Sequence, residues 1–196
     1  MALRNIYLSH QTVHNWVQTF GVELGINLRL ARQGKTGKKW HIDSTEIKIE
    51  GRTCYFYRCI DKSGNLIDVY LSDTKNQDAE ETFFDQCRDQ AGFDPDMITT
   101  DKETAFYPAM NEVFSERTEH RDVKYKNNRI ESDHRGVKLR YRAMKGLKDE
   151  FSALRFLGAF EEVRQLFNMR RISRSERRNI IPSKMRQYAE MWSYAN

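Results

Sequence analysis

Three carboxylates stand out because of where the sequence pattern places them. Asp43 lies inside an apolar strand, Asp101 directly follows a second short strand, and Glu131 lies on a late helix. A carboxylate among apolar neighbours is costly to desolvate unless a positive charge, such as a metal ion, compensates it. If the two strands are neighbours, Asp43 and Asp101 face each other and the helix brings Glu131 across the gap. Three carboxylates could then hold two Mg²⁺ ions.

Such a pair of ions suits phosphoryl transfer. Two ions about 3.5 to 4 Å apart clamp the attacking and leaving oxygens of an in-line displacement, with water or a 3′ hydroxyl as the nucleophile. Lys138 lies two helical turns after Glu131 and shares its helix face. Its ammonium group would hold the DNA backbone near the metal ions. The pattern therefore favours a site that acts on nucleic acid.

Each carboxylate also has a purely structural interpretation. Asp43 can be a strand carboxylate that pairs with Arg58 or Lys48. The second carboxylate precedes a helix and can be a turn or cap residue. The third fits the acidic end of a capping box that begins at Asn128. Spacing alone leaves these alternatives open.

Short apolar segments separated by turn residues predict a β-sheet. Residues 40–49 and 53–60 are rich in β-branched and aromatic residues, with Glu50-Gly51-Arg52 as a tight turn between them. Lys62-Ser63-Gly64-Asn65 supplies a second turn. The strands that we expect are residues 40–49, 53–60, 66–71, 97–100 and 118–125.

Helical periodicity predicts the elements that flank the sheet. A helix capped by Asp73 or Thr74 should end at Gly92, and its buried side chains should be Ala79, Phe83, Phe84, Cys87 and Ala91. Further helices are expected over residues 105–114, with Pro108 in the first turn, and from Asn127-Asn128 onward. Residues 151–169 form an amphipathic pattern whose inward side chains should be Leu154, Leu157, Phe160, Val163 and Phe167.

The N-terminal segment predicts one short helix and a linker. Ser9 is a suitable cap, the apolar periodicity ends at Gly21, and residues 29–39 are basic and contain glycine. The polar face of this helix would suit a helix-turn-helix reader of DNA, but the partner helix that should precede Ser9 is missing. We interpret the helix as a structural remnant.

Composition and charge narrow the function classes. The net charge is +5 and the pI is near 9.1, but residues 121–186 hold 19 Lys+Arg against 8 Asp+Glu, a net of +11 that leaves −6 for the remainder. A basic C-terminal third suggests a face that meets phosphates, although charge runs are often only solvated surface. Mean hydropathy of −0.80 and the absence of a signal peptide predict a cytosolic protein. Its three cysteines are expected to be buried thiols rather than zinc ligands.

Three segments in order resemble one family. WHIDSTEIKIEGRTCYFYRCIDKSGNLIDVYLS, ITTDKETAFYPA and VKYKNNRIESDHRGVKLRYRAMKG are similar to the DDE transposases of bacterial insertion sequences, specifically the insertion-sequence six family. The resemblance runs from LSHQTVHNWV to about Arg171. It implies an α/β, ribonuclease-H-like fold with a mixed five-stranded sheet flanked by helices. It also implies that Asp43, Asp101 and Glu131 are the catalytic, metal-binding triad.

The resemblance implies an activity and its partners. The expected enzyme is a polynucleotidyl transferase that uses Mg²⁺, or Mn²⁺ in its place, to cut double-stranded DNA and join the ends to a target, as a homo-oligomer on bacterial nucleoid DNA. The alternatives are a truncated remnant that only binds DNA and a nuclease that cuts without joining. Residues 1–38 would be the DNA-binding remnant and linker, 39–172 the catalytic domain and 173–196 a basic tail. The expected DNA-binding residues are Lys102, Asn128, His134, Arg135 and Lys138.

Overall fold

The computed structural model describes residues 9–100, 106–114, 116–122, 137–138, 147–166, 182–183 and 186. The chain divides into two compact units. One unit spans residues 32–154 and contains the sheet. The other combines the described parts of residues 1–31 and 155–196. No helix among the described residues is both long and apolar enough to cross a membrane.

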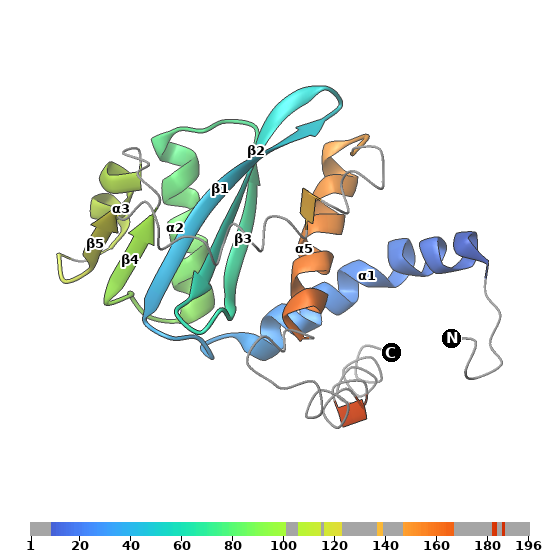
Figure 1. Cartoon of the computed structure of the whole chain (residues 1–196), viewed down its shortest axis with the longest axis horizontal. Helices are drawn as coiled ribbons and strands as arrows, with labels where there is room; N and C mark the ends of the chain where they lie inside the picture. Colours follow the sequence, from blue (N-terminus) through green and yellow to red (C-terminus); the bar gives the residue numbers. More distant parts are fainter. Residues whose placement is uncertain are drawn as a thin grey trace. The chain divides into compact units, whose positions relative to one another are not determined.

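A mixed five-stranded sheet forms the larger unit (Figure 1). Its order is β3-β2-β1-β4-β5, with antiparallel pairs on the β2 side of β1 and parallel pairs on the β4 side. This confirms the predicted sheet, and every expected strand is present. The strands are β1 Lys39–Ile49, β2 Arg52–Asp61, β3 Leu66–Ser72, β4 Met97–Thr100 and β5 Glu119–Asp122.

Two tight turns fix the register of the three long strands. Glu50 and Gly51 both have positive φ, 52° and 79°, which is the backbone of a type I′ hairpin turn. Lys48 therefore pairs with Thr53, and the pairing continues to Trp40 opposite Asp61. Because a slip of one residue would turn every side chain to the other face, the turn determines which side chains each face carries.

Asp61 organises the second turn. Its side chain is 3% exposed, yet its two oxygens accept four hydrogen bonds. The donors are the backbone N–H groups of Gly37, Ser63 and Asn65, and the Asn65 side-chain amide, at 2.7–2.9 Å. A buried carboxylate needs such partners. The carboxylate thus ties the segment before β1 to the β2–β3 turn.

Two helices cover one face of the sheet and build the core. They are α2, Gln77–Ala91, and α3, Phe106–Val113. The cap of α2 is Asn76 rather than the predicted Asp73 or Thr74, because the Asn76 side chain accepts the Ala79 N–H, while Thr74 bonds to Ser72. Gly92 ends the helix in the left-handed conformation, as predicted. All five side chains of α2 that were expected to be inward are buried.

The core includes the predicted buried cysteines. Cys59 on β2 and Cys87 on α2 are both fully buried, among aromatic residues such as Trp40, Tyr57 and Phe83. Burial raises the pKa of both thiols, so they stay protonated. These cysteines therefore pack as small apolar side chains.

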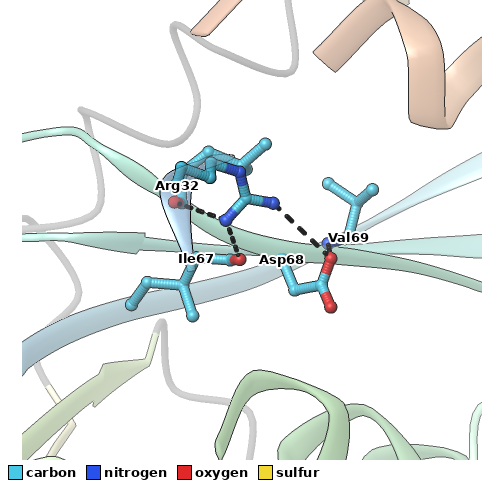
Figure 2. Close-up of polar contacts among 5 residues, drawn as sticks. Arg32, Ile67, Asp68 and Val69 are labelled. Atoms are coloured by element: carbon cyan, nitrogen blue, oxygen red, sulfur yellow. Dashed lines mark hydrogen bonds and ion pairs between the residues drawn. The ribbon is translucent and has the colours of Figure 1, made fainter. Parts of the chain in front are cut away.

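Arg32 fastens the start of the larger unit to β3 (Figure 2). Its guanidinium donates to the Leu66 carbonyl at 3.0 Å and to the Ile67 carbonyl, and it lies 3.8 Å from the Asp68 carboxylate. These residues sit at an irregularity in the β2–β3 pairing. Asp68 is 2% exposed, so the nearby guanidinium compensates a buried negative charge.

The smaller unit holds most of two helices, α1 His10–Arg32 and α5 Glu150–Leu166. Ser9 caps α1 as predicted, with its hydroxyl accepting the Thr12 N–H. The predicted end at Gly21 is wrong, because α1 continues to Arg32 and takes in the start of the supposed linker. Packing explains the difference. A Cβ at Gly25 would lie 3.1 Å from Ala159 Cα, so glycine lets α1 approach α5 closely.

The buried stripe of α5 differs in part from the prediction, and the predicted Phe160 and Val163 are only half-buried. Leu157 is buried as expected, but Leu154 is 47% exposed and Ala153 is buried in its place. Glu161 continues this stripe two turns later and is fully buried, 3.2 Å from Arg164. A buried acidic residue interrupts apolar periodicity, which is why the pattern pointed to the neighbouring face. Phe167 lies outside the described residues.

We predict that Asp61→Asn lowers the free energy of unfolding by about 1–3 kcal/mol, because an amide nitrogen replaces one acceptor and leaves two partly buried donors unsatisfied. Urea denaturation measures this. The control is Asp96→Asn, whose side chain is 62% exposed and 3.9 Å from Lys38, and which should cost less than about 0.5 kcal/mol. Equal effects of the two changes would refute the role of Asp61.

Candidate active site

Asp43 lies in the middle of β1, which pairs with β2 over Trp40–Ile49 and with β4 over Lys39–His41. On one side Asp43 is opposite Arg58 of β2, and on the other side β1 pairs with β4. Its Oδ1 accepts the Ser44 backbone N–H at 2.9 Å. The side chain is half-buried and projects from the face opposite the α2 core, since Ile42 beside it belongs to that core. The carboxylate is thus fixed in direction and still reaches the surface.

The end of β4 lies beside this part of β1. The two strands run parallel, with Trp40 opposite Ile98 and His41 opposite Thr99. β4 ends one residue later, at Thr100. The carboxyl end of β4 therefore points along the segment of β1 that carries Asp43. Carboxyl ends of parallel strands are where ligands and catalytic groups commonly collect.

A hydrogen bond holds the end of β4 to β5. Thr100 Oγ1 and His120 Nε2 are 2.9 Å apart, and the Tyr107 ring of α3 lies 5.6 Å from the imidazole. Burial lowers the pKa of His120, and the Asp122 carboxylate offsets part of that effect. No local pattern in the sequence indicates this pair, because twenty residues separate its members. Its effect is to anchor the residue that precedes Asp101.

The other predicted site residues are described only in part. Lys138 is helical and exposed, and Val137 before it is fully buried, so Lys138 lies on the solvent side of this segment. Among the described residues, no cluster of three His, Cys, Asp or Glu side chains could hold a metal ion. Two of the three predicted ligands are not in that set. Outside the described residues lie Asp101, Lys102, Asn128, Glu131, His134 and Arg135.

The structure decides between Lys48 and Arg58, the two residues that the sequence suggested as partners of Asp43. Lys48 is five residues along the same strand, so strand alternation puts it on the opposite face, and it is exposed. Arg58 is directly opposite in register and is 2% exposed. Lys48 is therefore not a partner of Asp43, and Arg58 is its cross-strand neighbour.

The sequence matches a known family over most of this unit. A family model described as a DDE domain covers residues 37–170. The chain belongs to the DDE transposase family. This confirms the predicted resemblance to transposases of bacterial insertion sequences. The matched span includes all five strands and the position of Asp43.

A curated relative supports the same assignment. The transposase for insertion sequence-like element IS431mec of Staphylococcus aureus, strain Mu50, is 34% identical over 141 residues. The match covers 70% of this chain and 62% of the relative. The chain thus spans less than two thirds of the length of that transposase.

Solved structures match the fold. A chain of the simian T-cell lymphotropic virus intasome in complex with PP2A regulatory subunit B56 gamma superposes with a TM-score of 0.52 at 13% identity, covering 73% of this chain and 53% of that one. The HTLV-2 integrase catalytic core domain in complex with magnesium, in its dimeric form, gives 0.50 at 16% identity, covering 72% and 94%. At such identities the likeness shows the ribonuclease-H-like fold alone.

We predict that stability falls as pH drops below about 6.5 and that His120 contributes to the loss. Its pKa is lowered in the folded state, so the unfolded chain takes up the proton first and acid favours unfolding. His120→Gln can still bond to Thr100 but does not titrate, so it should reduce this pH dependence. Urea denaturation at neutral pH and about 1.5 pH units lower tests this. The same pH dependence in both proteins would contradict the prediction.

Proposed function

We propose that this chain carries the catalytic domain of a transposase that cuts DNA and joins the released ends to target DNA, with Asp43, Asp101 and Glu131 as ligands of divalent metal ions. The observation that carries the proposal is the pairing of β1 with β4. This pairing brings the described end of β4, Thr100, beside the part of β1 that leads to Asp43. The second family carboxylate is the next residue in the sequence.

The register supports a pair of carboxylates. His41 pairs with Thr99, and β4 ends at Thr100, the residue before the second family carboxylate in the sequence. Asp43 is two residues beyond His41 on the neighbouring strand. Carboxylate oxygens are the ligands that Mg²⁺ prefers, and a half-buried carboxylate can be reached by an ion that keeps several waters. The donor set therefore fits Mg²⁺ or Mn²⁺, and Glu131 would complete it.

The proposed chemistry is an in-line displacement at phosphorus. Metal ions bound there would activate the nucleophile and stabilise the leaving 3′ oxygen. In cleavage a water oxygen bonds to phosphorus as the bond to the 3′ oxygen breaks, and in joining a 3′ hydroxyl takes the place of water. The chain orients Asp43 on a paired strand, and Lys138 offers an exposed ammonium group to a phosphate.

The wider assembly is also a proposal. Residues 39–172 would act as the catalytic domain, between a DNA-binding segment and linker (1–38) and a basic tail (173–196), as a homo-oligomer on DNA in the bacterial cytoplasm. The basic segment 121–186, with a net charge of +11, supports a DNA-facing surface. Its proposed DNA contacts are Lys102, Asn128, His134, Arg135 and Lys138.

We predict that Asp43→Asn, Asp101→Asn and Glu131→Gln each abolish metal-dependent nicking and strand joining of labelled duplex DNA, because each removes a charged metal ligand. The assay compares Mg²⁺ and Mn²⁺. Glu46→Gln is the matched control, since Glu46 is an exposed acid of β1 on the face opposite Asp43. It should retain activity.

Three results would contradict the proposal in different ways. Activity that survives the loss of any one carboxylate would remove that residue from the metal site. Cutting without joining would indicate a nuclease. DNA binding without any metal-dependent product, in the wild-type chain, would indicate a protein that binds DNA without catalysis.

A further inference from the structure

Tyr107 is an aromatic side chain that the fold leaves open to solvent. It is the second residue of α3 and is 53% exposed. Its helix neighbours Phe106, Ala109 and Met110 are buried in the core, so α3 is anchored without the Tyr107 ring. Single exposed apolar side chains are common on protein surfaces, so exposure alone assigns no role to this residue. Its contacts and its place in the fold distinguish it.

The Tyr107 ring lies against a histidine that is itself held in place. The centroids of the Tyr107 and His120 rings are 5.6 Å apart, and their planes are tilted by 51°. The His120 imidazole is half-buried, and its Nε2 is 2.9 Å from the Oγ1 of Thr100, the last residue of β4. These contacts join α3, β5 and β4. The exposed ring is therefore backed by a neighbour that a hydrogen bond fixes.

This pair of rings lies at the carboxyl end of β4. Thr100 immediately precedes the second proposed metal ligand in the sequence. The side chain of Ile98 belongs to the α2 core, and Thr100 shares its strand face, so His120 and Tyr107 lie on the helix side of the sheet. Asp43 projects from the other side. The rings thus border the proposed metal site and do not form part of it.

Its location separates Tyr107 from the other large apolar side chains that are exposed in the described part of the chain. All of those lie on α1 or α5, and they are Phe20, Ile26, Leu30, Phe151 and Leu154. Tyr107 contacts a residue that is bonded to the end of β4. A molecule that approaches this end of the sheet therefore meets the Tyr107 ring.

The charges on β5 beside the rings are of both signs. The Arg121 guanidinium donates to the Glu119 carboxylate at 2.9 Å, and the acidic Asp122 follows it. An exposed arginine that already has an acidic partner attracts a phosphate less strongly than one that has none. A ligand of this surface would therefore be bound through a flat apolar face more than through negative charge.

We propose that Tyr107, backed by His120, is a stacking platform for an unpaired DNA base that flanks the reacting phosphate. The inference rests on the proposed function of this chain in cutting and joining DNA. Every base has a π face on which an aromatic side chain can stack. Inside a duplex the neighbouring base pairs cover that face, so the ring can reach only a base that is unpaired or at a strand end. Cutting and joining take place at strand ends, which supply such a base.

An unpaired fluorescent base tests the platform without metal ions and without catalysis. The probe is a duplex with a short 3′ overhang that carries 2-aminopurine, an adenine analogue whose emission falls when it stacks on an aromatic ring. The full wild-type chain should quench this probe and bind it more tightly than a blunt duplex. Tyr107→Ala should abolish the quenching and weaken overhang binding about tenfold, with blunt-duplex binding unchanged.

Three controls distinguish stacking from other effects. Tyr107→Phe keeps the ring and should retain both the quenching and the affinity. Phe151→Ala removes a ring that is 67% exposed at the start of α5, and it should behave like the wild type. Stacking releases no counterions, so the ratio of the wild-type and Tyr107→Ala affinities for the overhang should be the same at low and high salt.

The outcomes separate this inference from the proposed function. Quenching that survives in Tyr107→Ala, or a loss of quenching that Phe151→Ala shares, would overturn the platform. If the wild type cuts and joins DNA in Mg²⁺ but does not quench the probe, the platform fails and the proposed function stands. If the wild type binds neither duplex, the proposed function fails and the platform fails with it.

Discussion

The pairing of β1 with both β2 and β4 is the constraint on which the site depends. β1 pairs with β2 over Trp40–Ile49 and with β4 over Lys39–His41, so the strand cannot shift in register without breaking two ladders. Antiparallel pairing with β2 fixes what lies across from Asp43, and parallel pairing with β4 fixes where the chain leaves that strand. A carboxylate on such a strand is held before any ligand arrives. This rigidity is what a metal or catalytic site requires.

Three carboxylates of the same sheet differ in their burial and in their partners, and these differences distinguish a structural role from a chemical one. Asp61 is buried and satisfied by N–H donors in a turn. Asp68 is buried and lies beside the Arg32 guanidinium (Figure 2). Asp43 differs because it is half-buried, on the sheet face away from the α2 core, and beside the end of a parallel strand. Both buried carboxylates are closed to solvent, while Asp43 can receive a ligand.

Local patterns predicted the sheet well because its signals are local. Gly51 and the turn at Asn65 follow from turn chemistry, and apolar alternation marks the strands. The length of α1 was not predictable in this way. Glycine is a weak helix former, and only the structure shows that Gly25 is needed for close packing against Ala159 of α5. The buried face of α5 was missed for a similar reason, since the buried Glu161 interrupts the apolar pattern.

The site was predictable to the extent that its signals lay in one strand. Asp43 was found because an acid inside an apolar strand is unusual. The choice between Arg58 and Lys48 as its neighbour needed the register of β2, which depends on the hairpin turn. The Thr100–His120 bond joins β4 to β5, and no periodicity within either strand reports it. Sequence thus identified the residue types, and long-range pairing supplied the contacts.

The most direct test of the central claim is a crystal structure of the full chain grown with Mn²⁺ and examined by anomalous scattering. The account predicts a manganese peak about 2.2 Å from a carboxylate oxygen of Asp43 and from one of Asp101. Manganese bound elsewhere, with the Asp43 carboxylate outside its coordination sphere, would contradict it.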